Sequence, residues 1–388
     1  MITRKFNPWP HFGEEEIEAV TRVLQSGKVN QWTGEEVSKF EKDYREYLGV
    51  KYAIALANGS VALDLALTVL DIKLGDEVIV TPRTFVASVH CIALKGATPV
   101  FAEVDRESQN ITLESVRKVL TSKTRAVIAV HLAGWPCELD ELRKFCDDHN
   151  IFLIEDCAQA HGAAYNGKPV GSFGHVSAFS FCQDKIITTG GEGGLLVTND
   201  EKLWSRAWSY KDHGKDYDLM FNRSTNEGFN WVVKSFGTNY RMTEMQAAIG
   251  RIQLAKLDSW IEKRRKLANI FNDAFLDCPA LRLTVPTNKY FHSYYKYYVF
   301  IRPEKLKKGW SKDRIINELN EKGIFCGGGS CPEVYLEKPF CQYRKERFPV
   351  AKELGETSMM FLVHPTLNES DIHRVVEEVR ILMKAAIK

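Results

Sequence analysis

Apolar segments alternate with helix-like segments through the first half of the chain, and this alternation constrains the fold more than any other feature. Apolar residues at helical spacing occupy 14–26 and 61–70. Segments that are apolar along their whole length lie at 52–57, 77–82, 98–104, 125–132, 151–156, 175–181 and 194–199. Strands of this kind are buried on both faces, as in mostly parallel sheets covered by helices. The pattern predicts an α/β fold with a mostly parallel central sheet.

The second half of the chain changes pattern twice. Residues 211–237 are polar and rich in aromatic residues, which indicates a long functional loop or an excursion into an interface. A long helical stretch over 242–275 then leads to a strand-like segment at 295–302 and to further helices. We therefore predict a large α/β domain over 1–255 and a smaller C-terminal α+β domain over 256–388, joined by a long helix.

Charge and cysteine content exclude several classes of protein. The 388 residues carry 52 basic and 50 acidic side chains, a net charge of +2, so we expect neither nucleic acid nor a membrane as partner. The first residues lack the apolar core of a signal peptide, and no apolar run approaches the roughly 18 residues of a spanning helix. Nine scattered cysteines suit reduced thiols, and their spacing matches no zinc site. We expect a cytoplasmic protein without a metal.

Three polar signals follow predicted strands. Asp156 ends one strand, Ser60 follows another within "NGS", and Lys185 follows a third, just before the glycine-rich "TTGGEGG". In open α/β sheets, ligands bind beyond the carboxyl ends of the strands. Each signal alone is weak, because an aspartate or a glycine turn at such a place often only caps a helix. Together they predict one site at one edge of the sheet.

The combination suits one cofactor, pyridoxal phosphate. Exposed N–H groups of Gly59, Ser60 and Val61 at a helix start would bind a phosphate. The amine of Lys185 can form a Schiff base with an aldehyde, and the Asp156 carboxylate can hold a pyridine nitrogen protonated. A dinucleotide-binding site fits less well, because no helix opens after the glycine run. A P-loop is not indicated either, because its lysine–serine pair is missing.

Three longer motifs carry a resemblance to a known family. "IEDCAQAHGA", "FSF…K…TTGGEGG" and "FGTNYRMTEMQAAIGRIQL" together are similar to the DegT/DnrJ/EryC1/StrS family of sugar aminotransferases, and the likeness extends over nearly the whole chain. The resemblance implies a fold-type-I, aspartate aminotransferase-like enzyme that binds pyridoxal phosphate. It also implies a homodimer with two active sites at the subunit interface.

The resemblance also implies roles for individual residues. Lys185 would be the Schiff-base lysine, and Asp156 the partner of the pyridine nitrogen. Gln159 would contact the ring hydroxyl, and Phe85 would stack on the ring. The remaining expected contacts are to phosphate, from Ser180 with the backbone at Ser60 and Val61, and from Asn239 to the phosphate of the neighbouring subunit. Core or helix-capping roles remain open for Phe85, Ser180 and Asn239.

The chain departs from the family pattern at several positions. "TTGGEGG" has an additional glycine, Gly190 or Gly191, which affects the local loop geometry. Trp135 stands where a polar residue is expected and is a candidate for shaping the sugar pocket. One branch of the family has histidine in place of the lysine and removes a hydroxyl, and Lys185 argues against that branch.

The expected reaction moves an amino group from L-glutamate to a nucleotide-linked keto sugar. A 4-keto-6-deoxyhexose is the expected acceptor, for the biosynthesis of a surface polysaccharide or a glycoside. The segment 211–237 is a candidate for nucleotide or sugar contacts, and His213 and Trp231 are the residues named for it, without an assigned role. Two alternatives stay open: another reaction of the same cofactor, such as aromatisation of an aminohydroxybenzoate-type ring, and a cofactor-binding regulatory protein without turnover.

Overall fold

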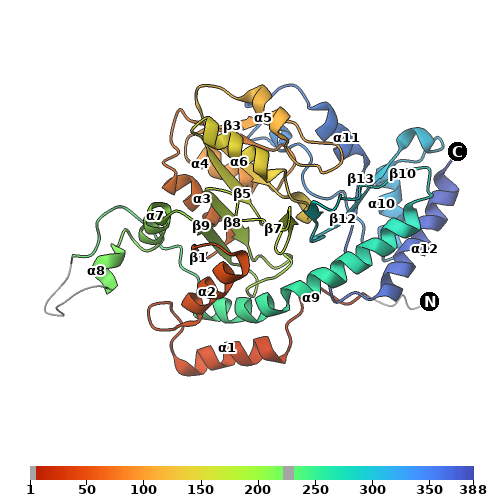
Figure 1. Cartoon of the computed structure of the whole chain (residues 1–388). Helices are drawn as coiled ribbons and strands as arrows, with labels where there is room; N and C mark the ends of the chain where they lie inside the picture. Colours follow the sequence, from red (N-terminus) through yellow and green to blue (C-terminus); the bar gives the residue numbers. More distant parts are fainter. Residues whose placement is uncertain (1–5, 222–230) are drawn as a thin grey trace.

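A seven-stranded sheet lies at the centre of the molecule (Figure 1). The computed structural model describes residues 6–221 and 231–388. β9 is antiparallel to both of its neighbours, and the other pairs in the sheet are parallel, which confirms the predicted α/β class. In spatial order the strands are β1 (Tyr52–Leu56), β9 (Gly194–Thr198), β8 (Val176–Ser180), β5 (Phe152–Asp156), β4 (Thr124–Val130), β2 (Glu77–Val80) and β3 (Thr98–Phe101).

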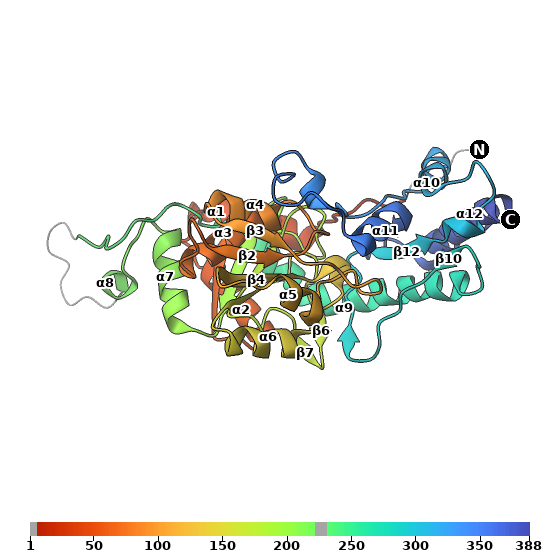
Figure 2. The same cartoon turned by 90° about the horizontal axis from the view of Figure 1, so that it is seen from above.

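Helices cover both faces of this sheet (Figure 2). Successive side chains of a strand point to opposite faces, so Ala53 and Ala55 of β1 pack in one core cluster and Ile54 and Leu56 in the other. Both faces are therefore apolar, which explains why the strands read as unbroken apolar runs. One face carries α3 (Gly59–Val69), α4 (Ala87–Leu94) and α7 (Glu201–Lys211), and the other carries α2 (Glu36–Leu48), α5 (Leu113–Val119) and α6 (Leu139–Asp148).

The long helix α9 (Glu244–Phe275) links the two parts of the molecule (Figure 1). It begins two residues after the predicted start, because the Thr243 side chain accepts a hydrogen bond from the Gln246 N–H and caps the helix. Its first half packs against α1 (Glu14–Ser26) and α2, and its second half packs against α12 (Glu369–Ala386). The domain boundary predicted after residue 255 falls inside this continuous helix, so the two-domain division stays a prediction.

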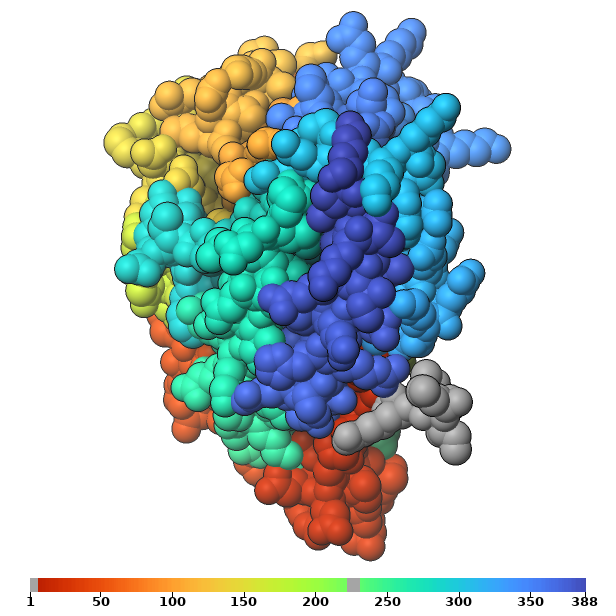
Figure 3. Space-filling model, turned by 90° about the vertical axis from the view of Figure 1, so that its right-hand side faces the viewer, coloured from red at the N-terminus to blue at the C-terminus, as the bar shows by residue number. Residues whose placement is uncertain are grey.

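A second, antiparallel sheet organises the C-terminal part. It consists of β10 (Leu281–Arg282), β12 (Tyr297–Ile301) and β13 (Ser358–Phe361), and it shares a core with α12 and the end of α9. Figure 3 shows α12 lying along α9 on the surface of this part. The other α-helices and strands of the described residues are α8 (Tyr217–Phe221), α10 (Lys312–Glu321), α11 (Pro349–Thr357), β6 (Ala164–Tyr165), β7 (Lys168–Pro169) and β11 (Tyr290–Phe291).

The segment predicted as a long loop over 211–237 contains the short helix α8, which stands away from the body of the molecule (Figure 1). Residues 222–230 lie outside the described residues. Within the described ranges, no helix is both long enough and apolar enough to cross a membrane.

Candidate active site

A cavity of about 610 Å³ opens at the carboxyl ends of the central strands. β1, β2, β4, β5 and β8 all run in the same direction, so the segments that follow them meet at one edge of the sheet. Seven of the residues predicted for the site line this cavity: Gly59, Ser60, Phe85, Asp156, Gln159, Ser180 and Lys185.

Two predicted residues lie elsewhere. The N–H of Val61 donates to the Asn58 side chain at 3.0 Å, so this group is already used to cap α3. The prediction that Val61 offers its N–H to a phosphate therefore does not fit the structure. Asn239 is exposed, pairs with Asp212 in an isolated bridge, and is not among the described residues that line the cavity. Its predicted role toward a neighbouring subunit stays a prediction.

The start of α3 forms one wall of the cavity. Asn58 takes the cap position, so the helix begins at Gly59, two residues before the predicted start. The first N–H groups of a helix have no partner inside it, which makes those of Gly59 and Ser60 available to an anion. A Cβ atom on Gly59 would lie 2.5 Å from the Cβ of Ser180, so only glycine allows the helix to start this close to β8.

Asp156 ends β5 at the floor of the cavity. Its Oδ2 accepts from the Ser88 hydroxyl at 2.7 Å, and its Oδ1 accepts from the Ala158 N–H at 3.1 Å. Burial raises the pKa of this carboxyl, although both donors act in the opposite direction. A buried carboxylate with two donors has acceptor capacity left for a protonated ring nitrogen.

Lys185 shares its surroundings with an acidic and an aromatic residue. Its Nζ lies 3.5 Å from Asp184 Oδ1 and 3.5 Å from the Tyr295 hydroxyl, which in turn donates to Asp184. Burial raises the pKa of Asp184, but Lys185, the Tyr295 hydroxyl and Lys296 outweigh it and hold this pKa below its usual range. The amine is thus held at the cavity by two groups that sequence reasoning missed.

Lys296 brings a second amine to the cavity. Its Nζ lies 4.0 Å from Asp184 Oδ2 and 4.6 Å from the centre of the Tyr295 ring. Burial lowers the pKa of Lys296 to about 8, and nearby Arg264 and Lys185 contribute to the shift. This amine therefore changes its charge near neutral pH.

The residues that depart from the family pattern, Gly190, Gly191 and Trp135, lie in different parts of the structure. Gly190 and Gly191 both have positive φ, 83° and 124°, so the glycine pair forms a turn that other residues adopt only with strain. Trp135 is buried against Tyr290 and His292 and is not among the described residues that line the cavity. The expectation that it shapes the sugar pocket therefore gains no support here and stays a prediction.

The glycine-rich segment near residue 329 forms another wall of the cavity. Gly329, Ser330 and Cys331 line it, and the Ser330 N–H donates to the Tyr298 hydroxyl at 2.8 Å. Gly329 has φ 89°, and a Cβ there would lie 2.1 Å from the same hydroxyl, so the segment passes over Tyr298 only as glycine. The sequence shows that this segment is unusually rich in glycine, but no pattern in it predicts that the segment lines the cavity.

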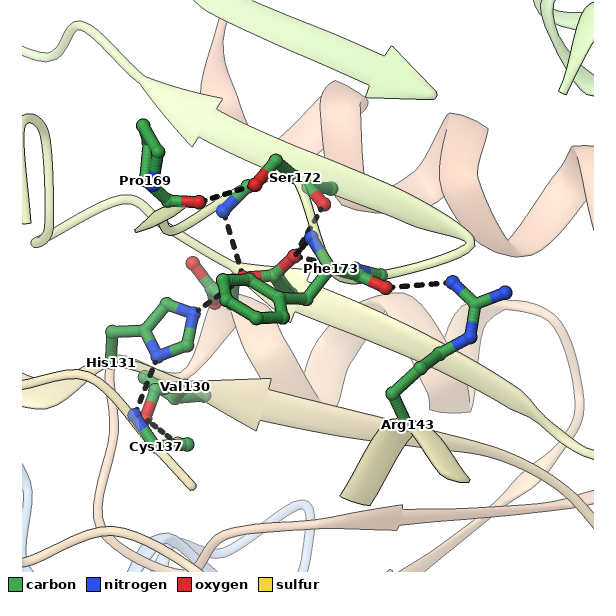
Figure 4. Close-up of polar contacts among 12 residues, drawn as sticks. Val130, His131, Cys137, Arg143, Pro169, Ser172 and Phe173 are labelled. Carbon is green, nitrogen blue, oxygen red and sulfur yellow. Dashed lines mark hydrogen bonds and ion pairs between the residues drawn. The ribbon is translucent and has the colours of Figure 1, made fainter. Parts of the chain in front are cut away.

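Glu155, one residue before Asp156, lies fully buried on the opposite face of the sheet. With His131 and Cys157 it forms a group close enough to hold a metal ion. Its oxygens, however, accept from five donors, and Figure 4 shows His131 and Phe173 among the residues of this network. The five donors are His131 Nε2, the N–H groups of Gly171, Phe173 and Gly174, and the Ser177 hydroxyl.

Both ring nitrogens of His131 are also engaged in hydrogen bonds. The Cys137 N–H donates to His131 Nδ1 at 3.0 Å, so Nε2 carries the proton that it gives to Glu155. Burial alone would raise the pKa of Glu155, but His131 and the backbone donors hold it below its usual range. The group therefore acts as a hydrogen-bond centre that fixes the turn 171–174 beside the active-site strand.

The chain is similar in sequence to known aminotransferases. The sequence profile described as the DegT/DnrJ/EryC1/StrS aminotransferase family matches residues 10–380. GDP-perosamine synthase of Escherichia coli O157:H7 is 34% identical over 370 residues, which cover 95% of this chain and 96% of that protein. A dTDP-3-amino-3,6-dideoxy-alpha-D-galactopyranose transaminase of Aneurinibacillus thermoaerophilus is 33% identical over 372 residues, 95% of each chain.

A solved structure extends the agreement to three dimensions. The aminotransferase from Psychrobacter cryohalolentis has 51% sequence identity and a TM-score of 0.96, and the match covers 98% of this chain and 99% of that one. The predicted family, enzyme class and cofactor are thereby confirmed. The chain belongs to the DegT/DnrJ/EryC1/StrS aminotransferase family and is an enzyme of the pyridoxal phosphate-dependent class.

Proposed function

We propose that this enzyme moves the amino group of L-glutamate to a nucleotide-linked keto sugar. The observation that carries the proposal is the meeting of Lys185, Asp156 and the start of α3 in one cavity. The two relatives named above are, by their names, enzymes of amino-sugar nucleotides, which supports this acceptor class. A 4-keto-6-deoxyhexose is the proposed sugar, and its product would serve a surface polysaccharide or a glycoside.

The cavity fits the cofactor residue by residue. The N–H groups of Gly59 and Ser60, with the Ser180 hydroxyl, would hold the phosphate, and the missing Cβ of Gly59 keeps this cradle open. Phe85 lines the cavity and is 63% exposed, so its ring is accessible for stacking. The Ala133 N–H donates to Gln159 Oε1 at 2.8 Å, which leaves the Gln159 amide to donate to a ring hydroxyl.

The chemistry is divided between cofactor and protein. When bound, pyridoxal phosphate supplies the aldehyde that accepts the amino group and a ring that withdraws electrons. Asp156 keeps the ring nitrogen protonated. Lys185 moves a proton at the donor's Cα, as base and then as acid, and the Tyr295 hydroxyl at 3.5 Å orients its amine.

We propose that the active unit is a homodimer. Exposed apolar side chains gather on and after the projecting segment, with Phe221 56%, Val233 56% and Phe236 97% exposed. Asn239 lies at the base of this segment, where it could reach the phosphate site of a second copy. An apolar surface of this kind is typical of a protein interface. Sedimentation of the purified protein tests the proposal, and a monomer at micromolar concentration would contradict it.

The first experiment is the visible absorption spectrum before and after L-glutamate is added. We expect the band of the bound cofactor to bleach with L-glutamate and to return when a nucleotide-linked 4-keto sugar is supplied. Lys185→Ala should still bind pyridoxal phosphate but show no glutamate-dependent bleaching and no turnover, because the proton at Cα has no base. Normal turnover in this variant would overturn the role of Lys185.

Product analysis separates the alternatives. Turnover of cyclic carbocycles in place of keto sugars would favour the ring-aromatising reaction. A band that is indifferent to every amino donor would favour a regulatory protein without turnover.

A further inference from the structure

A small charged cluster lies behind Lys185. Lys185 and Lys296 share the Asp184 carboxylate, at 3.5 and 4.0 Å, and both amines lie over the Tyr295 ring, at 5.0 and 4.6 Å from its centre. The two amines are therefore near neighbours at the wall of one cavity. Only one carboxylate is common to both.

Arg264 of α9 adds a third positive charge beneath this cluster. Arg264 is 1% exposed, and its Nη1 donates to the backbone oxygens of Tyr294 and Tyr295 at 3.4 and 3.3 Å. In the described parts of the chain, its Nε and Nη2 have no hydrogen-bond partner. Burial lowers the pKa of this guanidinium to about 9, although Tyr295 and Asp184 act in the opposite direction, and no described carboxylate forms an ion pair with it.

Among the described residues, Asp184 is the one carboxylate within ion-pair distance of the two amines, while Asp156 and Glu192 line the cavity farther from them. Asp371 lines the neighbouring apolar cavity together with Lys296, but its carboxylate accepts from the Asn368 N–H at 3.0 Å and caps α12. His364 lines that same cavity, and burial lowers its pKa to about 3, so it is neutral at physiological pH. Buried cations without matching anions are costly unless a ligand supplies the anion.

We propose that Lys296, supported by Arg264, binds a carboxylate of the amino donor. The proposal rests on the proposed function, since it names a residue of the same site. In an α-amino acid the carboxylate carbon is attached to the same carbon as the nitrogen. A donor whose nitrogen is near Lys185 thus brings its carboxylate near the neighbouring amine. Lys185 and Lys296 are the two basic side chains that the described residues contribute to the cavity.

The diphosphate of a nucleotide sugar is a second possible anion. It is attached to the anomeric carbon, several bonds from a keto carbon at position 4. With that keto carbon at Lys185, the diphosphate lies farther from this amine than a donor carboxylate does. The adjacency of Lys296 to Lys185 therefore favours the donor.

The test uses the loaded enzyme and compares Lys296→Met with Lys296→Arg. Lys42→Met is the matched control, because Lys42 lies on the exposed face of α2, with 61% of its side chain accessible. The bleaching of the cofactor band is followed against L-glutamate concentration, and its recovery against keto-sugar concentration. Binding of glutarate, a dicarboxylate without an amine, is measured by calorimetry on loaded and cofactor-free protein.

For Lys296→Met we expect the half-saturating L-glutamate concentration and the glutarate Kd to rise about tenfold or more, since an anion loses its charged partner. Lys296→Arg should stay within about threefold of the wild type, and the sugar step should be unchanged in both variants. Lys42→Met should match the wild type throughout. If Lys296→Met does not fold, Lys296→Gln replaces it.

Two outcomes would overturn the proposal. Unchanged glutarate binding and L-glutamate dependence in a folded, neutral variant would remove Lys296 from the donor site. An effect confined to the sugar step would assign the amine to the diphosphate. Failure of the proposed function is separable, because then the wild type itself would not respond to L-glutamate.

Discussion

At the scale of single residues, two adjacent carboxylates on β5 have opposite properties. Glu155 accepts five hydrogen bonds, and its pKa lies below the usual range, whereas Asp156 accepts two, and its pKa lies above it. Both are buried, which raises the pKa of each, but at Glu155 His131 and the backbone donors outweigh burial, whereas at Asp156 the donors do not. Asp156 is thus the carboxylate that gains most from a cationic partner, which is what a ring nitrogen provides.

Asp156→Asn tests this role. The amide cannot hold a ring nitrogen protonated, so we expect kcat to fall about 10²-fold or more, while cofactor binding and the thermal unfolding midpoint change little. Ser88→Ala removes only one donor to the carboxylate and should cost about tenfold. Steady-state kinetics with a saturating keto sugar measures both variants. Full turnover in Asp156→Asn would show that the ring nitrogen has another partner.

At the scale of elements, the Glu155 network ties β5 to the turn 171–174 and to the segment around His131. Glu155→Gln leaves one acceptor oxygen and places an N–H₂ group against N–H donors. We expect the free energy of unfolding to fall by about 2 to 4 kcal/mol, which urea unfolding measures.

An exposed glutamate provides the control for this substitution. Glu46 of α2 has 61% of its side chain accessible and only a 3.9 Å ion pair with Lys42. Glu46→Gln should therefore stay within about 0.5 kcal/mol of the wild type. Equal stability of Glu155→Gln and Glu46→Gln would refute the view that Glu155 organises this region.

Strands and helices were predictable because their signals are local. Apolar runs mark every strand of the central sheet, and the Thr243 cap lies beside the predicted start of the long helix. Asp156 and Lys185 were predictable because strand ends meet at one edge. Tyr295 and Lys296 reach the same cavity from a segment some 110 residues after Lys185, and no local pattern reports so distant a contact. Val61 was misplaced because the side chain of Asn58 competes for its N–H.

At the scale of the whole molecule, buried neutral histidines link stability to pH. His161 lies in the main core, His292 packs between Trp135 and Tyr294, and His364 packs on Trp9; all three are buried. Burial lowers the pKa of each to about 3. The Ser180 carbonyl at 2.8 Å can only accept, so His161 carries its proton on Nε2, and Nδ1 accepts from the Tyr44 hydroxyl at 2.7 Å. The hydrogen bonds around His161 in the folded protein therefore match its neutral imidazole.

These histidines predict acid unfolding. In the unfolded chain each has a pKa of about 6.5, so the unfolded state binds more protons between pH 6.5 and 3, and stability falls as the pH falls through this window. Well inside the window, three such groups lower the free energy of unfolding by about 4 kcal/mol for each pH unit. Since domains are stable by only about 5 to 15 kcal/mol, we expect unfolding before pH 4. His161→Gln, which can keep both hydrogen bonds, should reduce this slope by about a third in urea unfolding at pH 6, 5.5 and 5. An unchanged slope would mean that His161 binds its proton equally well in the folded and the unfolded state, and that the acid instability arises from the other groups.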